Sequence, residues 1–155
     1  MRLTTQTDYA LRVLMHAALA SDGLDRIDAV ARDFGISRNH LAKVVHSLSA
    51  LGYLRTVQGR NGGFRLGKTR DEISIGQVVR DFEPDLNLVE CFDASASVCR
   101  IQGNCVLARE LDKALDAFLA SLDAVTLDDL VRPGRSLRVQ LGMIVRQNGA
   151  AEGKD

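Results

Sequence analysis

Two short helical patterns separated by a tight turn restrict this chain to few folds. Residues 27–34 read as a short helix closed by Gly35, and Ser37 is typical of the N-cap of a second helix. Gly52 supplies the C-terminal stop of that second helix. Apolar residues recur along it at the spacing of one buried face, namely Leu41, Val44, Val45, Leu48 and Leu51. The pattern predicts a helix-turn-helix.

The flanking residues extend this motif into a winged helix. A capping box at residues 5–8 and an apolar stripe predict a helix over about residues 6–20. After the second helix, residues 53–57 and 64–66 read as two strands joined by a glycine-rich loop. We therefore expect a mainly α protein with a small β-hairpin wing, that is, a winged helix-turn-helix followed by a long dimerisation helix.

The dimerisation helix is predicted from the second half of the chain. Ser74 caps a helix over residues 75–82, and a long helix starts near Cys105. A capping box at residues 126–129 precedes a short apolar run at 127–131. The long helix carries an apolar seam longer than a chain of 155 residues needs to cover its own core, made of Leu107, Leu111, Ala114, Leu115, Phe118 and Leu122. A dimer seam is its natural use.

The formal net charge of zero hides a division between the two halves. Residues 1–70 hold eleven Lys/Arg against five Asp/Glu, whereas residues 71–155 hold nine against fifteen. Residues 34–70 contain seven basic side chains and no carboxylate, as expected of a surface that faces phosphates. The alternative is a solvated face whose helix pair packs against another protein.

Specific side chains on this basic surface are candidates for reading double-stranded DNA. In a helix-turn-helix the first residues of the second helix enter the major groove, and here they are Arg38, Asn39 and His40. Arginine can bond guanine and asparagine can bond adenine through two atoms each. The remaining predicted DNA contacts, which would mainly meet phosphates, are Lys43, Arg60, Asn61 and Arg65. His16 and His46 are assigned no functional role, because histidines beside apolar residues on helices are usually packed or solvated.

All three cysteines lie in one short stretch with the spacing C-x7-C-x5-C. The start of the chain lacks the apolar core of a signal peptide and no segment has the apolar length to span a bilayer, so we expect a cytoplasmic protein without a membrane partner. In the reducing cytoplasm, an odd number of cysteines argues against a disulfide framework. The spacing is wider than in common zinc sites, so zinc is the weaker metal. Iron-sulfur ligation, thiol redox sensing and inert packing remain open, and the stretch itself lacks a fourth ligand.

Five stretches of the chain together resemble one family of regulators. They are Met-Arg-Leu-Thr at the start with residues 7–12, residues 35–40, the wing at 59–67, the three cysteines, and residues 126–130. On these residues the chain resembles the NsrR repressors, nitric-oxide-sensing members of the winged-helix family that also contains the iron-sulfur regulator IscR. The likeness covers almost everything from Met1 to Val131.

The resemblance implies a homodimer that holds an iron-sulfur cluster. Its ligands would be Cys91, Cys99 and Cys105 for a 4Fe-4S cluster, with 2Fe-2S as the alternative, and Asp8 of the other protomer would be the fourth ligand. Where the IscR pattern has a histidine three residues beyond its last cysteine, this chain has Ala108, which favours the NsrR branch.

Asp8 also has a purely structural explanation. A capping box that begins at Thr5 requires a carboxylate at this place, and Arg12 lies one turn later, where it can pair with Asp8 when no cluster is bound. The sequence leaves both roles open.

These observations divide the chain into four parts. We expect a DNA-binding domain at 1–83, a cysteine-rich cluster-binding loop at 84–105, the dimerisation helix with a short helix at 106–131, and a partly disordered tail at 132–155. The predicted function is a dimeric repressor, not an enzyme, that releases its operator when nitric oxide nitrosylates the cluster, so that detoxification genes are expressed. The alternatives are a thiol-based sensor without a cluster, a regulator of iron-sulfur or iron homeostasis, and an electron carrier, which would not explain the basic surface.

Overall fold

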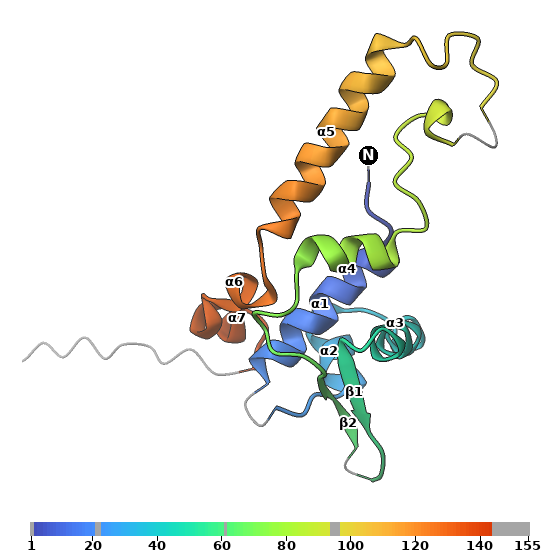
Figure 1. The fold of residues 1–155 in the computed structure, drawn as a ribbon. Coiled ribbons are helices and arrows are strands. Elements are labelled where there is room, and N and C mark those ends of the chain that lie inside the picture. The colour runs from blue at the N-terminus through green and yellow to red at the C-terminus, as the bar shows by residue number, and fades with distance from the viewer. Residues whose placement is uncertain (1, 21–22, 61, 94–96, 144–155) are drawn as a thin grey trace, which may run out of the picture.

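The protein consists of a helical body from which one long helix projects (Figure 1). The structure is a computed structural model that describes residues 2–20, 23–60, 62–93 and 97–143. The body contains α1 (Thr5–Leu19), α2 (Ile27–Phe34), α3 (Arg38–Ala50), α4 (Ile75–Phe82) and the hairpin of β1 (Leu54–Val57) and β2 (Gly63–Leu66). The projecting helix is α5 (Val106–Asp123), and α6 (Leu127–Val131) and α7 (Gly134–Gln140) return to the body. The expected winged-helix architecture with a long helix is confirmed.

The beginning of α1 corrects one sequence prediction. The N-cap is Thr4, whose side chain accepts the Thr7 N–H, so the helix starts one residue before the predicted boundary. Asp8 therefore lies beyond the position from which a capping-box carboxylate reaches back to the cap. The carboxylate that does reach this cap comes from Glu83, at the end of α4, and it accepts the Thr4 N–H at 2.8 Å. The capping-box prediction for Thr5 and Asp8 is wrong, because a tertiary contact supplies the acceptor.

The helix-turn-helix follows the sequence prediction closely. Gly35 ends α2 in the left-handed region at φ 66°, which a side chain would strain, and Ser37 caps α3 by accepting the His40 N–H. The prediction of the buried face is wrong for Leu51, which is the C-cap of α3 and is 43% exposed. The helix has ended there, so helical spacing no longer keeps that side chain on the buried face.

The wing has an additional partner that the sequence did not predict. β1 and β2 pair antiparallel, with Leu54 opposite Leu66 and Val57 opposite Gly63. Asp25, in the connection between α1 and α2, forms a bridge to Phe64 through backbone hydrogen bonds of 2.7 and 2.8 Å. The connection before the helix-turn-helix is thus fixed to the wing.

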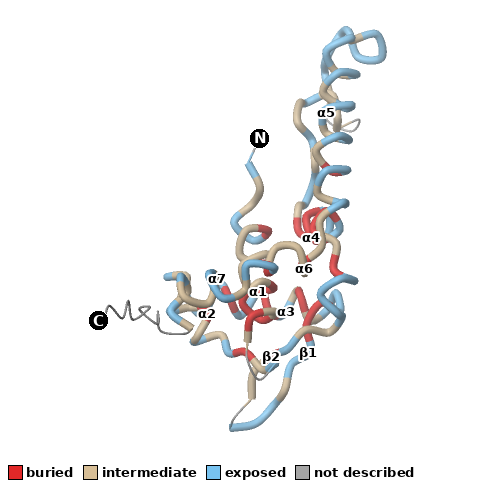
Figure 2. Tube along the Cα trace, turned by 90° about the vertical axis from the view of Figure 1, so that its left-hand side faces the viewer, coloured by how far each residue is buried: buried red, intermediate tan, exposed pale blue. Residues whose placement is uncertain are grey.

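The hydrophobic core lies in the body and leaves α5 largely outside it (Figure 2). Its largest fully buried apolar side chains come from α1, α3, the wing and the segment around α6, and include Leu14, Leu41, Leu48, Leu54, Phe64, Ile73 and Leu127. Of the described residues between α4 and α6, Leu119 is the one buried hydrophobic side chain. Most of α5 therefore contributes nothing to the core of its own chain.

The base of α5 is held against α4. Arg80 forms two hydrogen bonds with the carboxylate of Asp123, at 2.6 and 2.7 Å. The Asp123 side chain lies so close to Gly76 that a Cβ at that position would overlap it. A backbone bridge between Ser74 and Thr126 closes the same junction.

The C-terminal elements partly confirm the predictions. The capping box of Thr126 and Asp129 is present at the start of α6. Residues 134–140, placed in the predicted tail, form α7, which opens on Pro133 and glycine and so carries a weak sequence signal. Residues 144–155 and the predicted disorder there lie outside the described residues. Among the helices that the structure describes, none combines the length and apolar character required to cross a bilayer.

Candidate functional site

The predicted DNA-reading side chains lie on the solvent-facing side of α3. Arg38, Asn39, His40 and Lys43 are all exposed, whereas the apolar residues of the same helix face the core. The Arg38 Nε lies 2.7 Å from the Asp28 carboxylate of α2, so the guanidinium has an exposed partner within the chain.

The wing presents the remaining predicted contacts. Arg60 and Arg65 are exposed, the former in the turn and the latter on β2. Asn61, predicted in the same turn, lies outside the described residues. Together with α3 these side chains form the candidate DNA interface, on two elements that the shared core fixes to one another.

The described part of the cysteine segment, residues 84–93 and 97–105, runs from the end of α4 to the far end of α5 (Figure 1). Cys91 is in a short 3-10 helix at Glu90–Phe92, Cys99 is exposed, and Cys105 is the N-cap of α5. None of the three is in a disulfide. The contacts between described residues here are local, such as the Val98 N–H to Glu90 at 2.9 Å and the Gln102 side chain to the Cys91 carbonyl at 3.5 Å.

The cysteine segment has the chemistry but not the assembled geometry of a cluster site. Three free thiols precede the N-terminus of a long helix, where no side chain caps the first N–H groups. Within the described ranges, however, no three His, Cys, Asp or Glu side chains are grouped closely enough to hold a metal ion. A single chain in this conformation supplies the donors without bringing them together.

Asp8 is a half-exposed carboxylate on α1, in the body, while the cysteine segment is at the tip of the projection (Figure 1). Its two oxygens meet Arg12, at 3.1 Å from Nε and 2.9 Å from the terminal nitrogen. The predicted Asp8–Arg12 pair is thus present. Arg12 in turn lies over the ring of Phe34 in α2, 5.6 Å from its centroid.

Glu83 is a residue of this region that sequence reasoning missed. Besides the Thr4 N–H, its carboxylate accepts the hydroxyls of Thr4 and Thr7. Glu83 follows α4 directly and precedes the cysteine segment, so it ties the root of that segment to the start of the helix that carries Asp8. The partners are far apart in sequence, and local spacing holds no signal of this contact.

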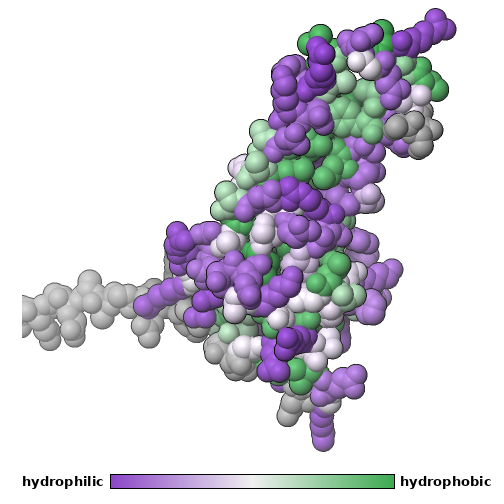
Figure 3. All heavy atoms as spheres, in the orientation of Figure 1, coloured by the Kyte–Doolittle hydropathy of each residue, from purple (hydrophilic) through white to green (hydrophobic). Residues whose placement is uncertain are grey.

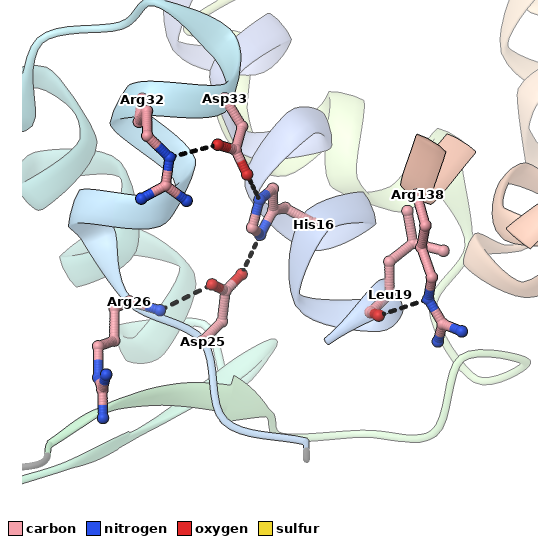
Figure 4. A network of polar contacts seen from close by, with 7 residues as sticks. All are labelled: His16, Leu19, Asp25, Arg26, Arg32, Asp33 and Arg138. Carbon is pink, nitrogen blue, oxygen red and sulfur yellow. Dashed lines mark hydrogen bonds and ion pairs between the residues drawn. The ribbon is translucent and has the colours of Figure 1, made fainter. Parts of the chain in front are cut away.

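His16 is the second residue that sequence reasoning missed. It is fully buried on α1, and its two ring nitrogens face the carboxylates of Asp25 and Asp33, at 2.5 and 3.0 Å (Figure 4). Burial alone lowers the pKa of His16, but the hydrogen bonds and negative charges of Asp25 and Asp33 outweigh it, so the pKa is raised above 6.5. Nothing in the spacing of these residues distinguishes them from surface charges.

In the described part of the chain, Leu122 of the α5 seam packs against the core, and the rest of the seam remains at least partly accessible. Leu107 is 65% exposed, and Leu111, Leu115, Phe118 and Leu122 are half-buried. Hydrophobic side chains gather over the projecting part of the molecule on the face shown in Figure 3. A patch of this kind is typical of a protein–protein contact surface.

Comparison with known proteins agrees with this geometry. Residues 3–133 match the Rrf2 family model, described as an iron-dependent transcriptional regulator. The HTH-type transcriptional regulator NsrR of Bacillus subtilis is 50% identical over 133 residues, which are 85% of this chain and 91% of that protein. NsrR of Geobacillus kaustophilus is 49% identical over 139 residues, covering 89% of this chain and 95% of the relative.

Solved structures give the same fold. CymR, the global cysteine regulator of B. subtilis, superposes with a TM-score of 0.70 at 25% identity, over 86% of this chain and 98% of its own. T. potens IscR superposes with a TM-score of 0.67 at 20% identity, over 89% of this chain and 91% of its own. At that identity the IscR likeness concerns the fold alone.

Proposed function

Because the chain belongs to the Rrf2 family of transcriptional regulators and is of the NsrR type, we propose that it is a dimeric DNA-binding repressor that senses nitric oxide through an iron-sulfur cluster. The exposed basic side chains of α3 and the wing support the DNA-binding part. The free thiols of the cysteine segment support the cluster. The accessible part of the α5 seam supports the dimer.

Two classes of contact bind the operator in this proposal. Arg38, Asn39 and His40 meet base edges at the start of α3, while Lys43 and the wing arginines meet phosphates. Since a symmetric dimer carries two such interfaces, the operator is a near-palindrome whose half-sites are separated by whole helical turns. A small rotation between the protomers then loses contacts in both grooves.

The residues that would hold the cluster are Cys91, Cys99 and Cys105 of one protomer and Asp8 of the other. We favour a 4Fe-4S cluster, with 2Fe-2S as the alternative. When bound, the cluster supplies irons with which nitric oxide reacts. The described part of one chain groups no such ligand set, and in this proposal Asp8 of the second protomer completes it.

The observation that carries this proposal is the freedom of Asp8. Thr4, not Thr5, caps α1, and Glu83 supplies the carboxylate that serves the cap, so Asp8 has no capping duty. Its remaining partner is Arg12, in an exposed pair with side chains 41% and 47% accessible. Such a pair contributes only a few tenths of a kcal/mol, about 0.2–0.5, so Asp8 can leave it at little cost.

The Asp8–Arg12 pair suggests how ligation of Asp8 affects the DNA interface. Arg12 binds Asp8 and lies over Phe34, the last residue of α2. If Asp8 held a cluster of the partner, Arg12 would lose that carboxylate and the contact between α1 and α2 would change. Since α2 leads directly into α3, the position of the reading helix would respond.

Anaerobic purification of wild type, Asp8→Ala and Asp116→Ala tests the proposal. Asp116 is an exposed carboxylate on α5 and serves as the matched control. We expect wild type and the control to be brown, with iron and acid-labile sulfide in near-equal amounts, and Asp8→Ala to show an altered absorption spectrum and a different rate of reaction with nitric oxide. An unchanged spectrum and rate in Asp8→Ala reject this ligand. A colourless wild type favours a thiol sensor, for which the exposed Cys99 is available.

A further inference from the structure

A buried histidine joins three elements that the proposed DNA interface depends on. His16, on α1, is 1% exposed, and each of its ring nitrogens faces a carboxylate: Nδ1 lies 2.5 Å from Asp25 and Nε2 lies 3.0 Å from Asp33 (Figure 4). Asp25 and Asp33 are themselves nearly inaccessible, with side chains 4% and 7% exposed. We call His16, Asp25 and Asp33 the histidine clamp.

The two carboxylates belong to elements that hold the interface in place. Asp33 is the penultimate residue of α2, just before the turn into α3. Asp25 pairs through its backbone with Phe64 of β2, so it is fixed to the wing. The histidine clamp therefore fastens α1 to the helix-turn-helix on one side and to the wing on the other.

The other oxygen of each carboxylate already has a donor. Asp25 accepts the Arg26 backbone N–H at 2.7 Å, and Asp33 accepts Nε of Arg32 at 2.9 Å. Among the described residues, the imidazole is the donor to the oxygens that face His16. A neutral imidazole has one N–H and only the charged ring has two, so the geometry is fully satisfied when His16 is protonated.

The remaining charged groups around the clamp are arginines. Arg12 of α1 lies over Phe34, whose ring meets the His16 ring edge-on at 6.0 Å. Arg138 of α7 donates to the Leu19 carbonyl at 2.9 Å and, with Arg32, lines a cavity of about 270 Å³ beside His16. These cations oppose protonation, whereas the two carboxylates in direct contact favour it. The cavity gives the proton a route to solvent.

We propose that the histidine clamp is a proton-dependent device: charged His16 holds α1 against α2 and the wing, and loss of its proton loosens this contact and weakens operator binding. The first half of this proposal concerns the folded chain alone, and the second half rests on the proposed DNA-binding function. His16 touches no DNA and acts as a positioning residue for the interface. Sensitivity to pH is then separate from the response of the cysteine segment.

The direction of the pH effect follows from the raised pKa of His16. A group whose pKa is higher in the folded than in the unfolded chain stabilises the fold fully below its unfolded pKa of about 6.5. That contribution disappears as the pH rises through the folded pKa. Alkaline conditions therefore loosen the clamp, and mildly acidic conditions tighten it.

Urea unfolding of the cluster-free full-length protein, followed from about pH 6 to about pH 9, tests the first half. Wild type should lose stability toward alkaline pH, and His16→Gln should lose less, because an amide carries no titrating proton. His46→Gln, at an exposed position of α3, is the matched control and should follow wild type. Parallel pH profiles for wild type and His16→Gln overturn the proposal.

Proton NMR of the wild-type imidazoles provides a measurement that does not require His16→Gln to fold. The chain has three histidines, and His46→Gln and His40→Gln identify two of the three signals. The third signal, that of His16, should titrate with a pKa above 6.5. Titration of that signal below 6.5 also overturns the proposal.

Operator binding over the same pH range tests the second half at fixed salt. Wild type should bind about tenfold more weakly at the alkaline end, and this loss should be smaller in His16→Gln. His40 is present in both proteins, so the difference between their losses of affinity is the relevant quantity. Equal losses in both overturn the coupling, whereas absence of operator binding at every pH overturns the proposed function and leaves the unfolding result to decide the clamp.

Discussion

At the residue scale, a single carboxylate organises the start of α1. Glu83 accepts the Thr4 N–H and the hydroxyls of Thr4 and Thr7, the last of which is fully buried. Glu83, at the end of another helix, thus takes the place of a capping-box carboxylate. It places the N-terminal turn of α1, and with it Asp8, relative to the root of the cysteine segment.

Replacement of Glu83 by Gln should therefore destabilise the fold. The charge that faces the N–H groups of α1 is lost, and the amide satisfies the cap less well, so we expect the free energy of unfolding to fall by about 1–2 kcal/mol. Urea unfolding of the cluster-free protein measures this decrease in the free energy of unfolding. Glu110→Gln is the control, since Glu110 forms only an exposed pair with Lys113 on α5 and should change stability by about 0.5 kcal/mol or less. Equal effects of the two substitutions would contradict this role for Glu83.

The predictability of individual residues depended on whether their partners are local. Ser37 and Thr126 were predicted as caps because the acceptor and the N–H lie three residues apart. The cap of α1 was misplaced because its carboxylate, Glu83, is distant in the sequence. His16 was assigned no role for the same reason, since its partners Asp25 and Asp33 become neighbours only when α1 and α2 pack together.

At the scale of elements, the proposed contacts with DNA are divided between α3 and the wing. The buried stripe of α3 fixes the helix in the core, and its exposed stripe carries Arg38, Asn39, His40 and Lys43. The hairpin is fixed through Asp25 and Phe64. These elements were predicted well because helical periodicity, glycine turns and strand alternation are local signals. Which base each side chain meets depends on the DNA, and sequence does not contain that geometry.

Two arginine variants distinguish base reading from phosphate binding. Arg38→Ala should weaken operator binding by about 1–3 kcal/mol and relax the preference for one base pair. Arg60→Ala should weaken binding to all sequences alike. It should also reduce the steepness of the decrease of log binding constant with log salt concentration by about 1. Fluorescence anisotropy with the operator and with single-base variants, across a salt series, measures both effects. Loss of sequence preference in Arg60→Ala but not in Arg38→Ala would reverse the assignment.

At the scale of the whole molecule, a projecting helix needs a partner. α5 contributes little to the core of its own chain and exposes an apolar seam, and its base is fixed to α4 by Arg80 and Asp123. The seam was visible in the sequence at helical spacing. Its direction away from the body was not, because it depends on the packing of Gly76 against Asp123 at the junction.

Leu115→Glu should convert the dimer to monomers, because a carboxylate in the centre of an apolar interface loses hydration without gaining a partner. Ala120→Glu, at an exposed position on the opposite side of α5, should remain dimeric. Sedimentation velocity measures the oligomeric state of the two variants and of wild type. Monomeric wild type, or a dimeric Leu115→Glu, would show that the seam is not the interface.

In the proposed function the cluster-bound dimer binds the operator, and nitric oxide ends this binding. An operator titration with anaerobically prepared protein tests both statements when nitric oxide is added stepwise while absorption and bound DNA are recorded together. We expect cluster absorption and operator binding to be lost in parallel, with a decrease in affinity of about a thousandfold, which corresponds to about 4 kcal/mol. Equal operator affinity of the cluster-loaded and cluster-free proteins at the same salt concentration would contradict it.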